Sequence, residues 1–174
     1  LAVTTVDYVG YRGEAMAIGE RAPIALIDAA ASTRMAVTES LTNIVAAPIE
    51  KIGHVKLSAN WMAAAGDNDQ ALALYEGVKA IGKEFCPALG IAIPVGKDSL
   101  SMQTKWEDKQ VMAPMTAVIT SFAPVSDVRD VWTPLLERDA RQAGQLYVLD
   151  LGQGQNRLGG SIHARVFGQI GNQC

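Results

Sequence analysis

The sequence has few of the features that mark a membrane, secreted or nucleic-acid-binding protein. Its two cysteines, Cys86 and Cys174, do not form a metal-type pair and cannot build a disulfide framework. No apolar run reaches the roughly 18 residues that a membrane span needs, and no charged segment leads into an apolar one as in a signal peptide. The net charge is -3 and basic residues form no block, so no nucleic-acid footprint is present. The composition is typical of a soluble cytoplasmic protein.

A helix is predicted over residues 23–46, because Pro23 suits a first turn and Pro48 follows its end. Glu39 and Asn43 are four residues apart, so the helix places both on one side. The same side runs back through Met35, Ser32 and Asp28. The opposite, apolar side is predicted to face a core and comprises Leu26, Ala30, Thr33, Val37, Leu41 and Ile44.

The pair formed by Glu39 and Asn43 offers two hard oxygen ligands side by side. Mg²⁺ takes few protein ligands and completes its shell with water and phosphate. The same spacing is also common on solvated helix faces, so spacing alone leaves both interpretations open.

Strand and helix patterns alternate along the rest of the chain, which predicts an α/β fold. A glycine-containing loop is expected through Gly10 and Gly13, and a second helix over 69–85 ends at Pro87. The predicted strands cover 1–6, 54–60, 91–95, 99–105 and 115–123, with a solvated turn at 107–110. We therefore expect one domain over 1–123. After it we expect a charged linker over 124–144 and then the start of a second α/β domain over 145–174. This start is predicted to hold a strand at 145–151 and a helix at 157–170.

Two loops carry further candidate binding groups. In residues 96–99, Lys97, Asp98 and Ser99 could contact a phosphorylated or amide-bearing substrate, although the sequence alone favours a turn with a local ion pair. The later glycine loop fails both phosphate motifs it approaches. Gly160 stands where a P-loop has lysine, and Arg157 stands at the third glycine of a dinucleotide fingerprint. Anion binding by its amides and a tight strand-to-helix connection both remain open.

Four blocks in the same order resemble phosphoribosylformylglycinamidine synthase of the large, multidomain type. They are GEAMAIGERAPIA, AVTESLTNI, VKLSANWMAAAG and PVGKDSLSM. The resemblance covers essentially the whole chain, and because chains of that family are several times longer, it implies an internal fragment from the second half of the synthetase region. It also implies a domain like that of aminoimidazole ribonucleotide synthetase, with a mixed sheet packed against helices.

The resemblance implies an ATP-dependent amidoligase of de novo purine biosynthesis. Such enzymes convert formylglycinamide ribonucleotide, glutamine and ATP to formylglycinamidine ribonucleotide, with Mg²⁺ and ATP or ADP bound. Glu39 and Asn43 match the family's magnesium ligands. The remaining ligands belong to an aspartate just before Leu1 and to a downstream domain, so we expect the chain alone to bind metal weakly or not at all.

The resemblance also names partners. They are the remaining domains of the same chain, including a glutaminase. That reaction needs a Cys nucleophile with His and Glu, and neither cysteine here has such a setting, so the isolated chain is expected to be inactive. No catalytic residue is assigned.

Two alternatives remain. The chain is a non-catalytic nucleotide-binding and interface module of the same enzyme, or it comes from another member of the aminoimidazole ribonucleotide synthetase superfamily. The GERAP and GKDSLSM blocks argue against the second.

Overall fold

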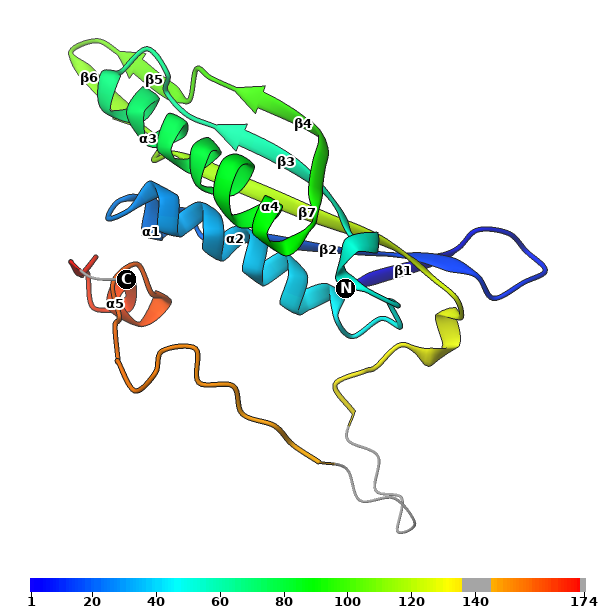
Figure 1. The fold of residues 1–174 in the computed structure, drawn as a ribbon. Helices are drawn as coiled ribbons and strands as arrows, with labels where there is room; N and C mark the ends of the chain where they lie inside the picture. The colour runs from blue at the N-terminus through cyan, green and yellow to red at the C-terminus, as the bar shows by residue number, and fades with distance from the viewer. Residues whose placement is uncertain (136–144, 173–174) are drawn as a thin grey trace.

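A five-stranded mixed sheet in the order β1-β2-β7-β3-β4 forms the centre of the computed structural model, which describes residues 1–135 and 145–172 (Figure 1). Strands β3 and β4 are parallel, and every other neighbouring pair in this sheet is antiparallel. The five strands are β1 (Ala2–Thr5), β2 (Gly13–Glu20), β3 (Lys56–Met62), β4 (Ala92–Ser99) and β7 (Thr116–Val125). A hairpin of β5 (Gln103–Trp106) and β6 (Lys109–Met112) projects from the sheet. The predicted α/β class with a mixed sheet is confirmed.

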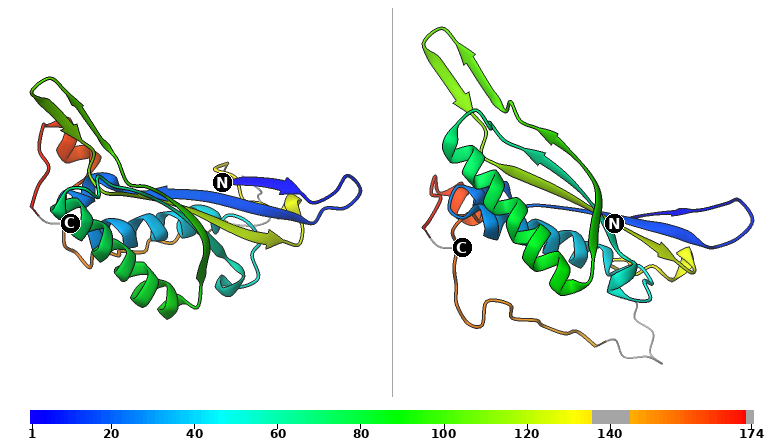
Figure 2. Two further views of the ribbon diagram at one scale, coloured as in Figure 1. Left: turned by 90° about the horizontal axis from the view of Figure 1, so that it is seen from above. Right: turned by 45° about the horizontal axis from the view of Figure 1, so that its top comes forward.

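Helices α2 (Ala29–Ile44) and α3 (Asn68–Lys79) lie side by side on one face of the sheet (Figure 2). Three short helices are α1 (Ala22–Ala25), α4 (Cys86–Leu89) and α5 (Ile162–Val166). No described helix is long and apolar enough to cross a membrane. The structure thus has two layers, with the other face of the sheet free of helices among the described residues.

The core lies between the sheet and α2 and is built largely from small side chains. Alternate residues of β7 are buried, as expected for a strand with one covered face. In β2 the buried positions hold only glycine and alanine, namely Gly13, Ala15, Ala17 and Gly19. A Cβ atom at Gly19 would lie 2.1 Å from the Ala36 carbonyl oxygen, so this glycine lets α2 approach β2 closely.

The helix predicted over 23–46 is broken into two. α1 ends at Ala25, and α2 starts after Asp28, whose side chain accepts a hydrogen bond from the Ala31 amide at 2.8 Å. Asp28 is therefore the N-cap of α2 and does not belong to the helix side that carries Glu39 and Asn43. Ser32 does not belong to that side either, because it is buried and its hydroxyl donates a hydrogen bond to the Arg21 carbonyl. On the predicted apolar side, Thr33, Val37 and Ile44 are buried as expected, whereas Leu26 is exposed in the break.

The second predicted helix continues beyond its expected end. α3 passes into a π-helical turn over Ala80–Phe85 and then into α4, which ends at Leu89 and is capped by Gly90 with φ of 68°. Pro87 does not end the helical segment, because it lies in the first turn of α4, where a backbone amide would have no acceptor within that helix. Cys86 is buried, and this burial raises the pKa of its thiol.

Several predicted strands are confirmed, and two loop predictions are wrong. β1, β3 and β7 match the patterns at 1–6, 54–60 and 115–123, and the turn at 107–110 joins β5 to β6. β5 starts only at Gln103, within the strand expected at 99–105. The expected loop through Gly13 is the start of β2, because its small alternating residues carry a weak strand signal. Residues 96–99 are not a loop but the end of β4, paired with β3.

The segment after β7 differs most from prediction. Residues 145–151 form no strand, and their apolar side chains, such as Val148 and Leu149, are exposed. A strand needs a neighbour for its backbone groups, and none pairs with this segment in the described part of the chain. The helix predicted over 157–170 is reduced to the five residues of α5. The domain boundaries at 123 and 145 remain predictions, and residues 136–144 of the predicted linker and Cys174 lie outside the described residues.

Candidate functional site

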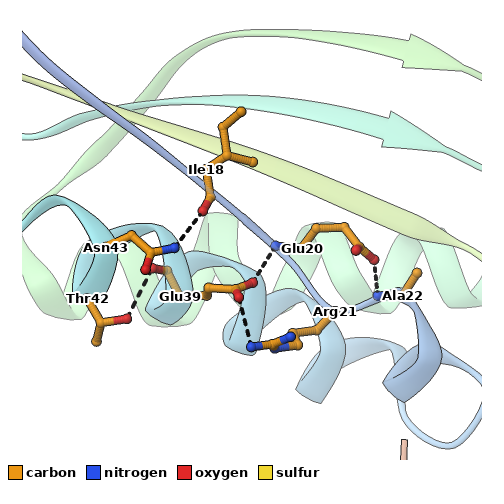
Figure 3. A network of polar contacts seen from close by, with 7 residues as sticks. All are labelled: Ile18, Glu20, Arg21, Ala22, Glu39, Thr42 and Asn43. Atoms are coloured by element: carbon orange, nitrogen blue, oxygen red, sulfur yellow. Dashed lines mark hydrogen bonds and ion pairs between the residues drawn. The ribbon is translucent and has the colours of Figure 1, made fainter. Parts of the chain in front are cut away.

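The candidate metal ligands face the end of β2 from the middle and last turns of α2. The contact allowed by Gly19 brings this part of the helix against the strand. Glu39 and Asn43 therefore reach the backbone of Ile18 and Glu20 (Figure 3). The predicted common side of the helix is confirmed for these two residues, although it faces a strand edge and is only partly solvated.

Both carboxylate oxygens of Glu39 have partners. Oε2 accepts a hydrogen bond from the Glu20 amide at 2.8 Å, and Oε1 pairs with Nη2 of Arg21 at 2.8 Å (Figure 3). The Glu39 side chain is 25% exposed. Glu20 itself turns back so that its Oε1 accepts from the Ala22 amide. Glu39 thus ties α2 to the segment that connects β2 to α1.

Asn43 uses its amide nitrogen and leaves its amide oxygen available. Nδ2 donates to the Ile18 carbonyl at 3.0 Å, and no described residue donates to Oδ1. Carboxylate and amide oxygens are the ligand types that Mg²⁺ prefers, so the donor chemistry of the pair fits this ion. The described residues contain no group of three or more His, Cys, Asp or Glu side chains that would hold a metal ion. Glu39 and Asn43 can therefore supply part of a magnesium shell.

The second set of predicted contacts lies elsewhere on the sheet. Lys97, Asp98 and Ser99 belong to β4, an edge strand that β7 and β3 separate from β2. The Lys97 ammonium donates to the Ser99 hydroxyl and to the Asp98 carbonyl. Lys97 lies opposite Asn60 of β3, on the face of the sheet away from the helices. The structure does not bring these residues to Glu39 and Asn43.

A large cavity adjoins the Glu39–Arg21 ion pair. It has a volume of about 1230 Å³ and lies between α1, the first half of α2 and residues 157–170. Its lining contains Glu20 and four arginines, Arg21, Arg34, Arg157 and Arg165, and we call it the arginine cavity. Gly159, Gly160 and Ser161 of the late glycine loop also line it.

Sequence reasoning did not group these arginines, although it named Arg157 in the glycine loop. They form no motif, and they come from a strand-to-helix connection, from α2 and from the C-terminal segment. The glycine loop was the only local signal near them. In this loop the Gly160 amide donates to the Ile170 carbonyl, and the Ser161 amide donates to the Leu158 carbonyl. The positive charge on this wall of the cavity therefore comes from the arginine side chains.

Comparison with known proteins agrees with this fold. A family model described as the FGAR-AT PurM_N-like domain matches residues 1–124. Phosphoribosylformylglycinamidine synthase II from Thermotoga maritima superposes with a TM-score of 0.57 at 23% identity, covering 77% of this chain and 21% of that chain.

Structures with bound ligands show the same likeness. T. maritima PurL complexed with ATP gives a TM-score of 0.57 at 22% identity, covering 76% of this chain and 21% of that one. T. maritima PurL complexed with FGAR gives a TM-score of 0.57 at 22% identity, covering 76% of this chain and 20% of that one. This chain spans about a fifth of the length of these proteins, and at such identity the likeness shows a shared fold. Because the family model covers more than half of the chain, the chain belongs to the family of FGAR-AT PurM_N-like domains, as its resemblance to phosphoribosylformylglycinamidine synthase implied.

Proposed function

We propose that this chain serves an ATP-dependent amidoligase that converts formylglycinamide ribonucleotide, with glutamine as amide donor, to formylglycinamidine ribonucleotide in cytoplasmic purine biosynthesis. Its membership of the FGAR-AT PurM_N-like family carries the proposal. Support also comes from similarly folded T. maritima structures complexed with ATP, ADP and FGAR. The rest of that enzyme, including the glutaminase, is the proposed partner.

Within this enzyme, Glu39 and Asn43 are proposed to hold Mg²⁺ on a nucleotide. Magnesium neutralises phosphate charge when bound, and a carboxylate beside an amide oxygen is a suitable partial shell for it. The free Oδ1 of Asn43 supports this role. The hydrogen bond from the Glu20 amide orients the Glu39 carboxylate, and Arg21 balances its charge while no ion is present.

A structural role for the same site is the second candidate. Glu39 already joins α2 to the end of β2 through two contacts, and the helix-free face of the sheet exposes apolar side chains such as Ile18 and Val95. A face of this kind suits packing against another domain. In a full-length synthetase that carries this domain, Glu39→Ala separates the candidates. Lost activity with an unchanged melting temperature supports turnover at this site, whereas lost stability supports the structural role.

Manganese provides a direct test of the metal ligands, because it replaces Mg²⁺ and broadens NMR signals nearby. With ADP present, we expect Mn²⁺ to broaden the amide signals of residues 18–20 and 39–43 first, at millimolar rather than micromolar affinity. Glu39→Gln should abolish this local effect, since glutamine keeps the acceptor for the Glu20 amide but loses the charge.

Glu76→Gln is the matched control, because Glu76 is a half-exposed acid on α3 whose partner is Lys79. It should leave the broadening unchanged. Unchanged broadening in Glu39→Gln, or strongest broadening at Asp98, would contradict the assignment. Micromolar affinity of the wild-type chain would contradict the idea that ligands are missing from it.

A further inference from the structure

The segment that carries Arg21 is held against α2 by contacts that do not involve the arginine side chain. The Glu20 amide donates to Oε2 of Glu39 at 2.8 Å, and the buried Ser32 hydroxyl donates to the Arg21 carbonyl at 2.8 Å. The Ala22 amide donates to the Glu20 side chain (Figure 3). These contacts fix residues 20–22 beside the helix, so the arginine side chain can change its position without moving the backbone.

The Arg21 guanidinium has a single partner among the residues that the structure describes. Its Nη2 atom lies 2.8 Å from Oε1 of Glu39, and the Arg21 side chain is 43% exposed. An ion pair this open to water is weak, because water solvates both charges when they separate. The pair can therefore open while Glu39 stays in place, since the Glu20 amide still holds its Oε2 atom.

Oε1 of Glu39 is also the oxygen that a metal ion would need. Oε2 is engaged by the Glu20 amide, and on the same side of the helix Asn43 keeps its Oδ1 atom available. A guanidinium and a divalent ion repel each other at one carboxylate oxygen, because both are positively charged. We propose that Arg21 is a displaceable counter-cation that occupies the metal's oxygen on Glu39 and thereby sets the metal affinity of the site. This inference rests on the proposed function, since it takes Glu39 and Asn43 as metal ligands.

Competition and a purely structural role of Arg21 predict opposite effects of Arg21→Gln. If Arg21 competes, its removal frees Oε1 of Glu39 and takes away a charge that repels the ion, so metal binding becomes tighter. If Arg21 only braces the carboxylate, its removal leaves Glu39 less ordered, and metal binding becomes weaker or stays the same. Glutamine keeps the backbone contacts of residues 20–22, so the substitution tests the charge and not the fold.

The test is a titration of the 174-residue chain with Mn²⁺, without nucleotide and in phosphate-free buffer, followed by the broadening of the amide signals of residues 39–43. We expect Arg21→Gln to bind Mn²⁺ about tenfold more tightly than the wild-type chain, because a divalent ion no longer has a guanidinium a few ångströms away. Arg34→Gln is the matched control, since Arg34 also lies on the cavity wall, on α2, but forms no ion pair with Glu39. It should change the affinity by no more than about twofold, because solvent screens a charge that is not in contact.

Thermal unfolding provides a second readout. Without metal, Arg21→Gln should melt at a lower temperature than the wild-type chain, because the Glu39 carboxylate loses its counter-charge. The same concentration of Mg²⁺ should then raise the melting temperature of Arg21→Gln more than that of the wild type, since a ligand that binds the folded state more tightly stabilises it more. An equal rise in both proteins would contradict competition.

The outcomes separate this inference from the proposed function. Broadening at residues 39–43 in the wild type that is unchanged or weaker in Arg21→Gln would overturn the role of Arg21 and leave the metal ligands standing. Equal tightening by Arg34→Gln would show that the net charge of the cavity, and not the pair of Arg21 with Glu39, governs the affinity. Absence of broadening at residues 39–43 in both proteins would overturn the metal ligands and this role together.

Discussion

Arg21 contacts both candidate sites. Its guanidinium pairs with Oε1 of Glu39, and the same side chain lines the arginine cavity. Under the proposed function, a magnesium ion at Glu39 would compete with Arg21 for this oxygen.

Gly19 determines how closely the two layers pack. We expect Gly19→Ala to lower the free energy of unfolding by about 1 to 3 kcal/mol, because the added Cβ would overlap the backbone of α2 at the Ala36 oxygen and the Ser40 nitrogen. Urea unfolding followed by circular dichroism measures this change. Gly82→Ala is the control, since a Cβ there meets nothing within 4 Å and should add about 0.5 to 1 kcal/mol. Equal effects of the two substitutions would contradict the role of Gly19.

At the scale of the element, one side chain sets where α2 starts, and packing against the sheet sets where it lies. Asp28 caps its first turn, and buried Thr33, Val37 and Ile44 hold it against the sheet. Because the helix carries Glu39, Asn43 and Arg34, its start and its position decide the geometry of both sites.

Removal of the cap is expected to destabilise α2. Asp28→Ala should cost about 1 kcal/mol of unfolding free energy, because the Ala31 amide loses its acceptor. Thermal or urea unfolding measures the loss. Glu84→Ala replaces an exposed acid in the π-helical turn and should change stability little. A neutral Asp28→Ala variant would show that packing alone fixes the start of the helix.

At the scale of the whole molecule, the core belongs almost entirely to one part of the chain. The buried apolar side chains lie between Ala15 and Val125, and residues 145–172 add only Ala164. The segment around α5 therefore contributes a wall of the arginine cavity but little to the core.

A shortened chain tests this division. A protein ending at residue 135 keeps the sheet, α1 to α4 and the hydrogen bond from the Trp132 amide to the Ala46 carbonyl, so we expect it to retain a single cooperative unfolding transition. Denaturant unfolding followed by tryptophan fluorescence, to which the partly buried Trp61 contributes, measures it. Loss of cooperativity would contradict the predicted independence of the first domain.

Features that depend only on the spacing of neighbouring residues were predictable from the sequence. β1, β3 and β7 carry apolar or β-branched alternation, and Glu39 and Asn43 share a helix side because of their spacing. β2 was missed because glycine and alanine occupy its buried positions, where close helix packing replaces large side chains. The strand expected at 145–151 was wrong because apolar residues form a strand only when another strand is there to pair with them.

The amino-acid sequence by itself determined the family, the α/β class and the shared side of Glu39 and Asn43, since motifs and helical spacing are properties of neighbouring residues. Only the tertiary structure decided that this side faces the end of β2, that Arg21 pairs with Glu39, and that four arginines surround one cavity. Arg21 and Arg34 lie far from Arg157 and Arg165 in the sequence. Their meeting depends on how the layers and the C-terminal segment pack, which no local pattern encodes.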